Sequence, residues 1–442
     1  MIGAIASPTK IIETPCFSAE GLDEALVYCT ASAGSEPVLC IVDPRPFPLR
    51  DRALADLNRL WKLQILDQVV PNPTSADIMD MAAKARRERP AAVIGIGGGS
   101  TLDSAKAVAM LLDSPGDLDE YLGPEAPLKP QERKVPLILI PTTTGTGSEV
   151  TRFGVYTARS GRKYTLNSPV LQAEAAILSP DLVADLPPPL VAATGYDALT
   201  HALETLWNKN ATALSDRLAL EASAAVLASL EPAWRASVAR EAERERHKER
   251  PQPEAGGGTG AAPASKEASA LADLQRAATL AGIAFNKTGT AAIHALSFIL
   301  SEEWHLSHGA ACAFFTQNIF DLNMGDPAVR GKFLILAKRV YQEAHQEANA
   351  GGRPESPTSR LSDEAYIQYL RDRLVELKYL MGLPDRFSDI PGFTGAAGPD
   401  GSVDREAVAA LFDKAQSDFK LKNNPVPCTQ DLVRQLVREK LS

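Results

Sequence analysis

Residues 91–112, AAVIGIGGGSTLDSAKAVAMLL, decide the fold that this sequence predicts. An apolar run that is typical of a buried strand leads through GGGS, residues 97–100, into a helical pattern. Glycines let a ligand approach the backbone, and the free amides and dipole of a helix start favour an anion. We therefore expect a phosphate-binding turn here. The structural alternative is that Ser100 only caps the helix, with Asp103 completing a pair like a capping box.

Two further apolar runs, PVLCIVD at 37–43 and VPLILIP at 135–141, alternate with helical stretches. Continuous apolar strands separated by helices indicate a parallel sheet that helices cover on both faces. After about residue 187 strand-like runs nearly vanish, and long Ala- and Leu-rich helical segments follow. We predict an α/β domain over 1–189 and an all-helical domain over 190–442. A flexible insertion is expected near 240–268, where a charge run precedes a Gly-, Pro- and Ala-rich stretch.

Composition narrows the class of protein. The 442 residues carry 46 Lys and Arg against 55 Asp and Glu, a net charge of −9, which argues against a broad nucleic-acid-binding surface. Nothing approaches 18 consecutive apolar residues, and the first residues lack the order of a signal peptide. We therefore expect no membrane contact. The five cysteines are scattered and odd in number, which indicates reduced thiols in a cytoplasmic protein.

A second polar loop, PTTTGTGSEVT at 141–151, directly follows the third apolar run. Hydroxyl side chains and glycines at the carboxyl end of a parallel strand lie where open α/β sheets bind ligands. A polar, glycine-rich turn without a ligand is the alternative. Two such loops after two strands favour a dinucleotide-binding domain.

The helical half carries a set of metal-ligand types. In TGYDALTHALE, Asp197 and His201 are four residues apart and would share one face of a helix. Of the six histidines in the chain, His294 and His308 add two more imidazoles further on. One carboxylate and three imidazoles suit a divalent transition metal such as Fe²⁺ or Zn²⁺. Taken alone, this first pair is explained better by Asp197 as a capping residue and His201 as a packed side chain.

The motifs GGGSTLDSAK, PTTTGTGSEVT, GYDALTHALE and HALSF…SHG resemble, in order and spacing, those of the iron-dependent (group III) alcohol dehydrogenases. The resemblance covers nearly the whole chain except the insertion near 240–268 and a stretch of similar composition at 347–362. It implies an N-terminal dinucleotide-binding domain with a parallel sheet, a C-terminal helical metal-binding domain, and a metal-dependent oxidoreductase. The expected reaction is hydride transfer between NAD(H) and a primary alcohol or aldehyde. The expected assembly is a homodimer or larger homo-oligomer.

Residue by residue, the resemblance implies that Asp197, His201, His294 and His308 bind the metal, Fe²⁺ or alternatively Zn²⁺, and form the catalytic centre. The positions implied on the cofactor side are Asp43, Asn72, Gly98, Gly99, Ser100, Asp103, Thr142, Thr143, Ser148, Lys163 and Leu182.

The preference between NAD and NADP is predicted from Asp43, at the end of the apolar run PVLCIVD. A carboxylate there accepts hydrogen bonds from the ribose hydroxyls and repels a 2′-phosphate, which favours NAD over NADP. The adjacent Arg45 softens this discrimination. Two positions depart from the family pattern. Phe298 stands where members usually carry a further histidine, for which His305 is a candidate substitute, and Ser179 replaces a usual Asp.

The substrate remains open at this stage. Unbranched alcohols and aldehydes are one candidate class. The run AFNKTGTAAIHALSF, with Phe298, is also similar to the phosphonoacetaldehyde reductase (hydroxyethylphosphonate dehydrogenase) branch, which implies an anionic aldehyde. Arg152 and Lys287 are the candidate cations for such a tail, Lys287 being expected on the same helix face as His294, about 10 Å away. A dehydroquinate synthase-like lyase is the remote alternative.

Overall fold

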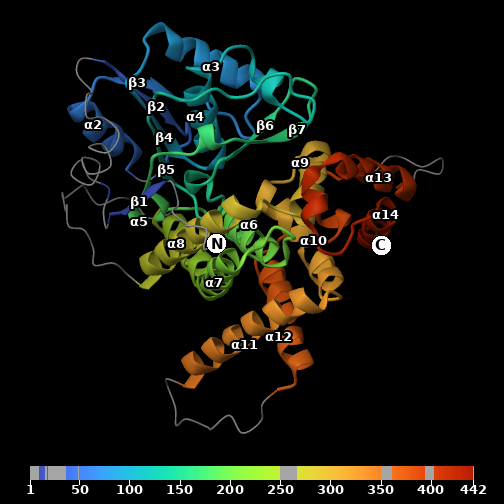
Figure 1. Cartoon of the computed structure of the whole chain (residues 1–442). Helices are drawn as coiled ribbons and strands as arrows, with labels where there is room; N and C mark the ends of the chain where they lie inside the picture. Colours follow the sequence, from blue (N-terminus) through green and yellow to red (C-terminus); the bar gives the residue numbers. More distant parts are fainter. Residues whose placement is uncertain are drawn as a thin grey trace. The chain divides into compact units, whose positions relative to one another are not determined.

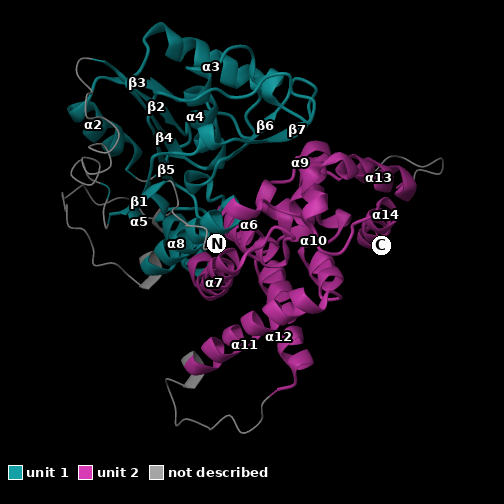
Figure 2. Ribbon diagram, viewed as in Figure 1, with its two compact units in different colours: residues 1–188, 235–286 teal, residues 189–234, 287–442 magenta. Residues whose placement is uncertain are grey.

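The computed structural model describes residues 9–14, 17, 36–47, 49–248, 266–349, 361–393 and 403–441. It divides into two compact units (Figure 2). Unit 1 comprises residues 1–188 and 235–286, and unit 2 comprises residues 189–234 and 287–442. The first division lies next to the predicted boundary.

Residues 235–286, however, group with unit 1, whereas the prediction placed them in the helical domain. Their polar contacts explain this grouping. Thr279 donates a hydrogen bond to Glu149 (Oγ1–Oε1 2.7 Å), and the amide of Gln275 donates to the carbonyl of Pro141 (3.2 Å). Chain order alone could not show that these helical residues return to the α/β unit.

Unit 1 is built on a six-stranded, all-parallel sheet (Figure 1). The strands in spatial order are β1 (Lys10–Glu13), β8 (Ala175–Leu178), β5 (Leu137–Pro141), β4 (Ala92–Gly97), β2 (Val38–Val42) and β3 (Leu63–Leu66). The three strands predicted from apolar runs are β2, β4 and β5, and every residue in them is buried. Pairing of Gly97 with Pro141 aligns the carboxyl ends of β4 and β5, so the two polar loops begin side by side.

Alternate residues of the central strands enter two separate cores. Leu39, Val93 and Leu139 pack on one face with α3 (Ser75–Arg87) and α4 (Gly99–Leu111). Cys40, Ile94 and Ile140 pack on the other face with α2 (Arg50–Leu60) and α5 (Pro180–Val183). This two-sided burial is why the strands read as unbroken apolar runs.

The rest of unit 1 includes an antiparallel hairpin of β6 (Phe153–Thr157) and β7 (Lys163–Asn167). Three short 3₁₀ helices complete it: η1 (Leu118–Tyr121), η2 (Ser148–Val150) and η3 (Pro169–Leu171). The helix α8 (Lys266–Thr288) also falls almost entirely in this unit.

All regular elements described in unit 2 are helices, as predicted. They are α6 (Pro188–Trp207), the first part of α7 (Ala213–Lys248), α9 (Ala292–Trp304), α10 (His308–Asn323), α11 (Pro327–Asn349), α12 (Asp363–Leu380), η4 (Phe387–Asp389), α13 (Arg405–Leu411), η5 (Phe412–Ser417), η6 (Phe419–Asn423) and α14 (Gln430–Lys440). Much of the predicted insertion, residues 249–265, lies outside the described residues. Before it, α7 continues to Lys248 with exposed side chains over 241–246. No helix in the described ranges is both long enough and apolar enough to cross a membrane.

Candidate metal centre and cofactor loops

Helix α6 presents the first two predicted ligands. Asp197 and His201 are one turn apart on it, and both side chains are buried. The His201 Nε2 lies 3.9 Å from the Asp197 Oδ1. The predicted shared helix face is therefore present.

Helices α9 and α10 bring the other two histidines to the same carboxylate. The Nε2 atoms of His294 and His308 each lie 3.6 Å from the Asp197 Oδ1. Close packing of α10 on α6 makes this possible at Gly309, where a Cβ would lie 1.8 Å from the carbonyl oxygen of Ala193. Only glycine permits this approach, and the residue just before it is His308.

The donor set fits a cation. The Asp197 Oδ1 and the His294 Nε2 are buried, and neither has a hydrogen-bond partner among the described residues. Two N or O atoms that bind one Zn²⁺-sized ion at about 2.0–2.2 Å lie at most about 4.4 Å apart. The separations of 3.6 and 3.9 Å meet this limit. Burial alone would raise the pKa of Asp197. The nearby His201 and His308 lower it by more than burial raises it, so the carboxylate stays ionised.

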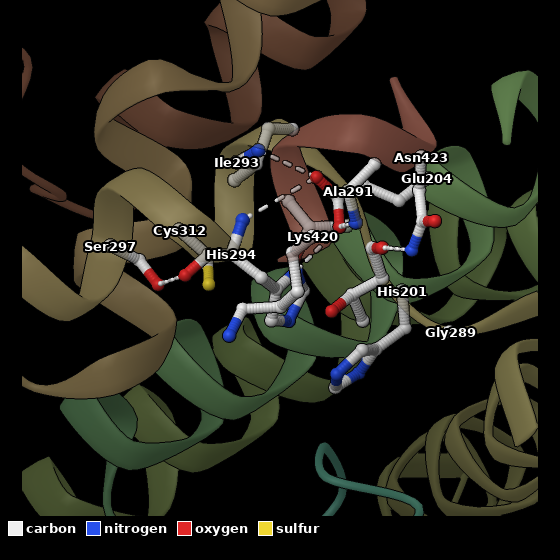
Figure 3. Close-up of polar contacts among 12 residues, drawn as sticks. His201, Glu204, Gly289, Ala291, Ile293, His294, Ser297, Cys312, Lys420 and Asn423 are labelled. Atoms are coloured by element: carbon white, nitrogen blue, oxygen red, sulfur yellow. Dashed lines mark hydrogen bonds and ion pairs between the residues drawn. The ribbon is translucent and has the colours of Figure 1, made fainter. Parts of the chain in front are cut away.

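Glu204 is a residue of this centre that the sequence reasoning missed. Its buried carboxylate accepts hydrogen bonds from the amides of Ala291 (2.5 Å) and Ile293 (2.6 Å) at the start of α9. It also contacts the His294 Nδ1 at 2.8 Å (Figure 3). Glu204 lies seven residues after Asp197 and three after His201, so the helical spacing was the signal available.

Cys312 is the second residue that the reasoning missed. It lies one turn after His308 on α10, and its Sγ is 3.9 Å from the His308 Nε2. One donor atom each from Asp197, His294, His308 and Cys312 lie within 4.8 Å of one another. Burial raises the pKa of the Cys312 thiol, but His294 and His308 lower it more, to about 7.

Phe298 occupies the position of the expected extra histidine. Its ring centroid lies 5.9 Å from that of His308, and the Lys420 Nζ lies 4.0 Å above the Phe298 ring. His305, the candidate substitute, is exposed and ends α9 in a left-handed conformation (φ 54°).

The first glycine loop of unit 1 starts α4. Gly98 is the N-cap residue and makes no side-chain cap, so the alternative in which Ser100 caps the helix is wrong. A Cβ on Gly97 would lie 2.5 Å from Thr101, and one on Gly99 would lie 2.7 Å from Thr146. The loop thus exposes helix-start amides on a backbone too crowded for side chains, as an anion site requires.

Three of the predicted cofactor residues, Asn72, Ser100 and Lys163, contact one another at this loop. The backbone amide of Asn72 donates a hydrogen bond to the Ser100 Oγ (3.2 Å), and the Lys163 Nζ donates to the side-chain Oδ1 of Asn72 (2.9 Å). Asn72 adopts a left-handed conformation with φ 55°. The sequence separation of these residues hid this contact, whereas the structure brings them together.

The second loop is tied to the first loop through the backbone and to α4 through the Ser148 hydroxyl. The Thr142 amide donates to the carbonyl of Gly97 (3.0 Å), and a Cβ on Gly98 would lie 3.2 Å from the Thr143 Cγ2. The Ser148 hydroxyl donates to Asp103 (2.7 Å). These contacts place both loops at the carboxyl ends of β4 and β5.

Lys106 is a third buried residue that the sequence reasoning missed. Its Nζ donates to the Ser148 Oγ (2.7 Å), the Thr151 Oγ1 (3.2 Å) and the Phe153 carbonyl (2.7 Å). Burial lowers its pKa to about 8. Lys106 therefore fixes the second loop and the start of β6 to α4 through these three hydrogen bonds.

Two further predicted cofactor positions have protein partners. Arg45 forms two side-chain hydrogen bonds with the Asp43 carboxylate, at 3.2 Å from Nε and 3.0 Å from Nη2. Leu182 is completely buried in the core between the sheet and α2. Asp43 therefore lies at a strand end with its charge partly balanced, and the Leu182 side chain packs in the interior.

The reasoning about Lys287 was wrong. We expected it on the same helix face as His294, but α8 ends at Thr288 and α9 begins at Ala292. Gly289, with φ 71°, breaks the helix between them. Lys287 is exposed in unit 2, while Arg152 lies in unit 1 with its guanidinium carbon 5.8 Å from the Phe153 ring centroid.

Comparison with known proteins settles the family. The iron-containing alcohol dehydrogenase model matches residues 16–180, and the C-terminal model of the Fe-containing alcohol dehydrogenase family matches residues 191–247 and 260–441. This chain is an iron-containing alcohol dehydrogenase by family. The predicted recognition, fold class and enzyme class are confirmed, and the lyase alternative is not favoured.

Curated relatives of this alcohol dehydrogenase family member cover most of its length. A 1-propanol dehydrogenase of Salmonella typhimurium is 30% identical over 89% of this chain and 90% of its own. A sulfoacetaldehyde reductase of Bilophila wadsworthia is 30% identical over 85% and 83%. Among solved structures, a 1,3-propanediol oxidoreductase has a TM-score of 0.77 at 23% identity, covering 98% of both chains. The structural likeness supports the fold.

Proposed function

We propose that this enzyme interconverts primary alcohols and aldehydes with NAD(H), using a divalent metal held by Asp197, His201, His294 and His308. The observation that carries the proposal is the meeting of three imidazoles at 3.6–3.9 Å from one buried Asp197 oxygen. The orphaned Asp197 Oδ1 and His294 Nε2 support a cation there, because buried polar atoms without partners are costly.

The chemistry of such a site is charge stabilisation. A divalent ion at these ligands supplies a Lewis acid for the carbonyl oxygen. The chain itself holds the ligands in place, since Glu204 contacts His294 on the ring nitrogen opposite Nε2. Phe298 adds an apolar surface beside His308. The hydride chemistry belongs to the nicotinamide.

Unit 1 would bind the cofactor. We assign the pyrophosphate to Gly98, Gly99 and Ser100, because that loop opens α4 without a side-chain cap. The linked pair Asn72 and Lys163 lies beside it. The remaining cofactor-side proposals are Asp43, Asp103, Thr142, Thr143, Ser148 and Leu182, the last through its backbone since its side chain is in the core. A solved sulfoacetaldehyde reductase from Bifidobacterium kashiwanohense, 22% identical, is in complex with NAD⁺.

Metal removal and replacement test the proposal. Chelated enzyme should lose NADH oxidation with propanal, and Fe²⁺ or Zn²⁺ should restore it. His294→Ala should retain far less metal in elemental analysis yet still bind NADH by fluorescence titration, because the cofactor loops belong to unit 1. His345→Ala, an exposed histidine on α11, is the matched control. Full metal content and activity in His294→Ala would refute the ligand set.

Anionic aldehydes form a second candidate substrate class. The sulfoacetaldehyde reductase relative acts, by its name, on such a molecule. In this chain Lys420 is buried, lies over the Phe298 ring at 4.0 Å, and is paired with Asp418 at 2.7 Å. It places a positive charge against the Phe298 ring, whose centroid lies 5.9 Å from that of His308, whereas Lys287 is exposed.

A substrate panel separates the two classes. Steady-state kinetics with propanal, sulfoacetaldehyde and phosphonoacetaldehyde should be measured for the native enzyme and Lys420→Met. If the anionic class is correct, the variant raises KM for the two anionic aldehydes by about tenfold or more while KM for propanal stays within about twofold. Equal loss for all three substrates means that Lys420 has a structural role only.

We also propose a homodimer or larger homo-oligomer and a cytoplasmic location, the latter in keeping with the free thiols of Cys40, Cys312 and Cys428. Light scattering coupled to size exclusion, and fractionation of native cells, test these two points.

A further inference from the structure

We infer that Cys312 is a sulfur ligand of the metal centre. This inference rests on the metal site proposed above and adds a donor that the predicted ligand set does not contain. The first observation is position. Cys312 follows His308 by four residues on α10, which is the spacing that Asp197 and His201 use on α6.

The second observation is distance. The Cys312 Sγ lies 3.9 Å from the His308 Nε2. A sulfur at about 2.3 Å and an imidazole nitrogen at about 2.1 Å from one zinc ion lie at most about 4.4 Å apart. The measured separation satisfies that bound. Cys312 also belongs to the group of four donor atoms that lie within 4.8 Å of one another.

The third observation is the state of its neighbours. The Asp197 Oδ1 and the His294 Nε2 belong to the same group, are buried, and have no hydrogen-bond partner in the described part of the chain. Cys312 is completely buried at the same place, and Figure 3 shows its sulfur beside His294. A cation among these atoms would satisfy all of them at once. The contact between the Cys312 Sγ and the His308 Nε2 satisfies only those two atoms and leaves the Asp197 Oδ1 and the His294 Nε2 without a partner among the described residues.

A thiolate has a chemical consequence for the choice of ion. Sulfur is a soft ligand that favours ions such as Zn²⁺, whereas carboxylates, carbonyls and water suit Mg²⁺ and Mn²⁺. Cys312 thus biases this centre toward thiophilic ions. Removing the sulfur should weaken Zn²⁺ binding about tenfold or more and Mn²⁺ binding much less.

Cobalt substitution tests the inference spectroscopically. Enzyme loaded with Co²⁺ should show visible ligand-field bands, which report occupancy, and a near-ultraviolet band from charge transfer between sulfur and cobalt. Cys312→Ala should keep the visible bands and lose the near-ultraviolet band. Cys428→Ser is the matched control, because Cys428 is also a buried thiol of unit 2 and should leave both features unchanged.

X-ray absorption on the zinc-loaded native enzyme adds a measurement that needs no variant. A sulfur scatterer at about 2.3 Å is expected. Nitrogen and oxygen scatterers alone, or a near-ultraviolet band that persists in Cys312→Ala, would overturn the inference and leave the metal site standing. Absence of the visible bands in the native protein would refute the metal site and, with it, the sulfur ligand.

Discussion

The Glu204 carboxylate joins the start of α9 to the His294 imidazole. One side chain accepts two amides at 2.5 and 2.6 Å and contacts the His294 Nδ1 at 2.8 Å. Glu204 therefore caps the start of α9. It also binds the Nδ1 of His294, which leaves the Nε2 of the same ring facing Asp197. Local folding and ligand orientation depend on the same group.

Glu204→Gln should weaken metal binding by about 10–100-fold, because a neutral amide holds the imidazole less strongly than a carboxylate. Competition with a chromophoric chelator gives the affinity. Glu221→Gln is the control, since Glu221 belongs to an exposed ion pair with Arg339 on the same unit. Unchanged affinity in Glu204→Gln would mean that Glu204 serves only as a cap.

Asp43→Gly should raise kcat/KM with NADPH relative to NADH, because it removes the repulsion of a 2′-phosphate. A second effect should add to this one, because Arg45 loses its carboxylate partner and becomes available to the 2′-phosphate. Asp43→Gly/Arg45→Ala should lose part of the gain. Native enzyme that already uses NADPH as well as NADH contradicts the assignment of Asp43.

Stability should depend on pH through Lys106. Burial lowers its pKa from 10.5 to about 8, so between these values the unfolded chain binds more protons than the folded chain. The free energy of unfolding therefore rises as the pH increases from about 8 toward 10.5, and this stabilisation is lost again as the pH falls back to about 8. The full change across this range is on the order of 3 kcal/mol.

Urea denaturation between pH 7.5 and 10 checks this. The difference in unfolding free energy between the native enzyme and Lys106→Met should change with pH in that direction. Lys62→Met, at an exposed lysine of the same unit, is the matched control. A flat difference for Lys106→Met would show that folding does not lower the pKa of Lys106.

Residues 249–265 lie outside the described residues, and their composition, rich in Gly, Pro and Ala, predicts that a short Gly/Ser linker can replace them. Loop entropy changes slowly with length, so the free energy of unfolding should change by about 1 kcal/mol or less. Rate, melting temperature and oligomer size are the measurements. A change of oligomer size would show that the segment belongs to an interface.

Sequence reasoning predicted β2, β4 and β5 because both faces of each strand are buried, which leaves an unbroken apolar signature. It did not predict β1, β3, β8 or the β6–β7 hairpin. β1, β3, β6 and β7 are short and contain partly exposed residues, so their pattern does not stand out. β8 is fully buried, but it is only four residues long.

Within the candidate site, spacing on one helix was readable and contact between helices was not. The shared helix face of Asp197 and His201 follows from helical geometry alone. The approach of His308 depends on Gly309 meeting Ala193, which no local pattern encodes. The same limit explains the error over Lys287, because the break at Gly289 was read as continuous helix.

The position of the ligands on three different helices has a further consequence. Asp197, His294 and His308 belong to α6, α9 and α10, so an ion bound to all three acts as a cross-link within unit 2. Free ion at about 1,000 times its dissociation constant would add about 4 kcal/mol to the stability of the folded state. The supply of metal in the cell would then govern how long each copy of the enzyme survives proteolysis, in addition to how fast it works.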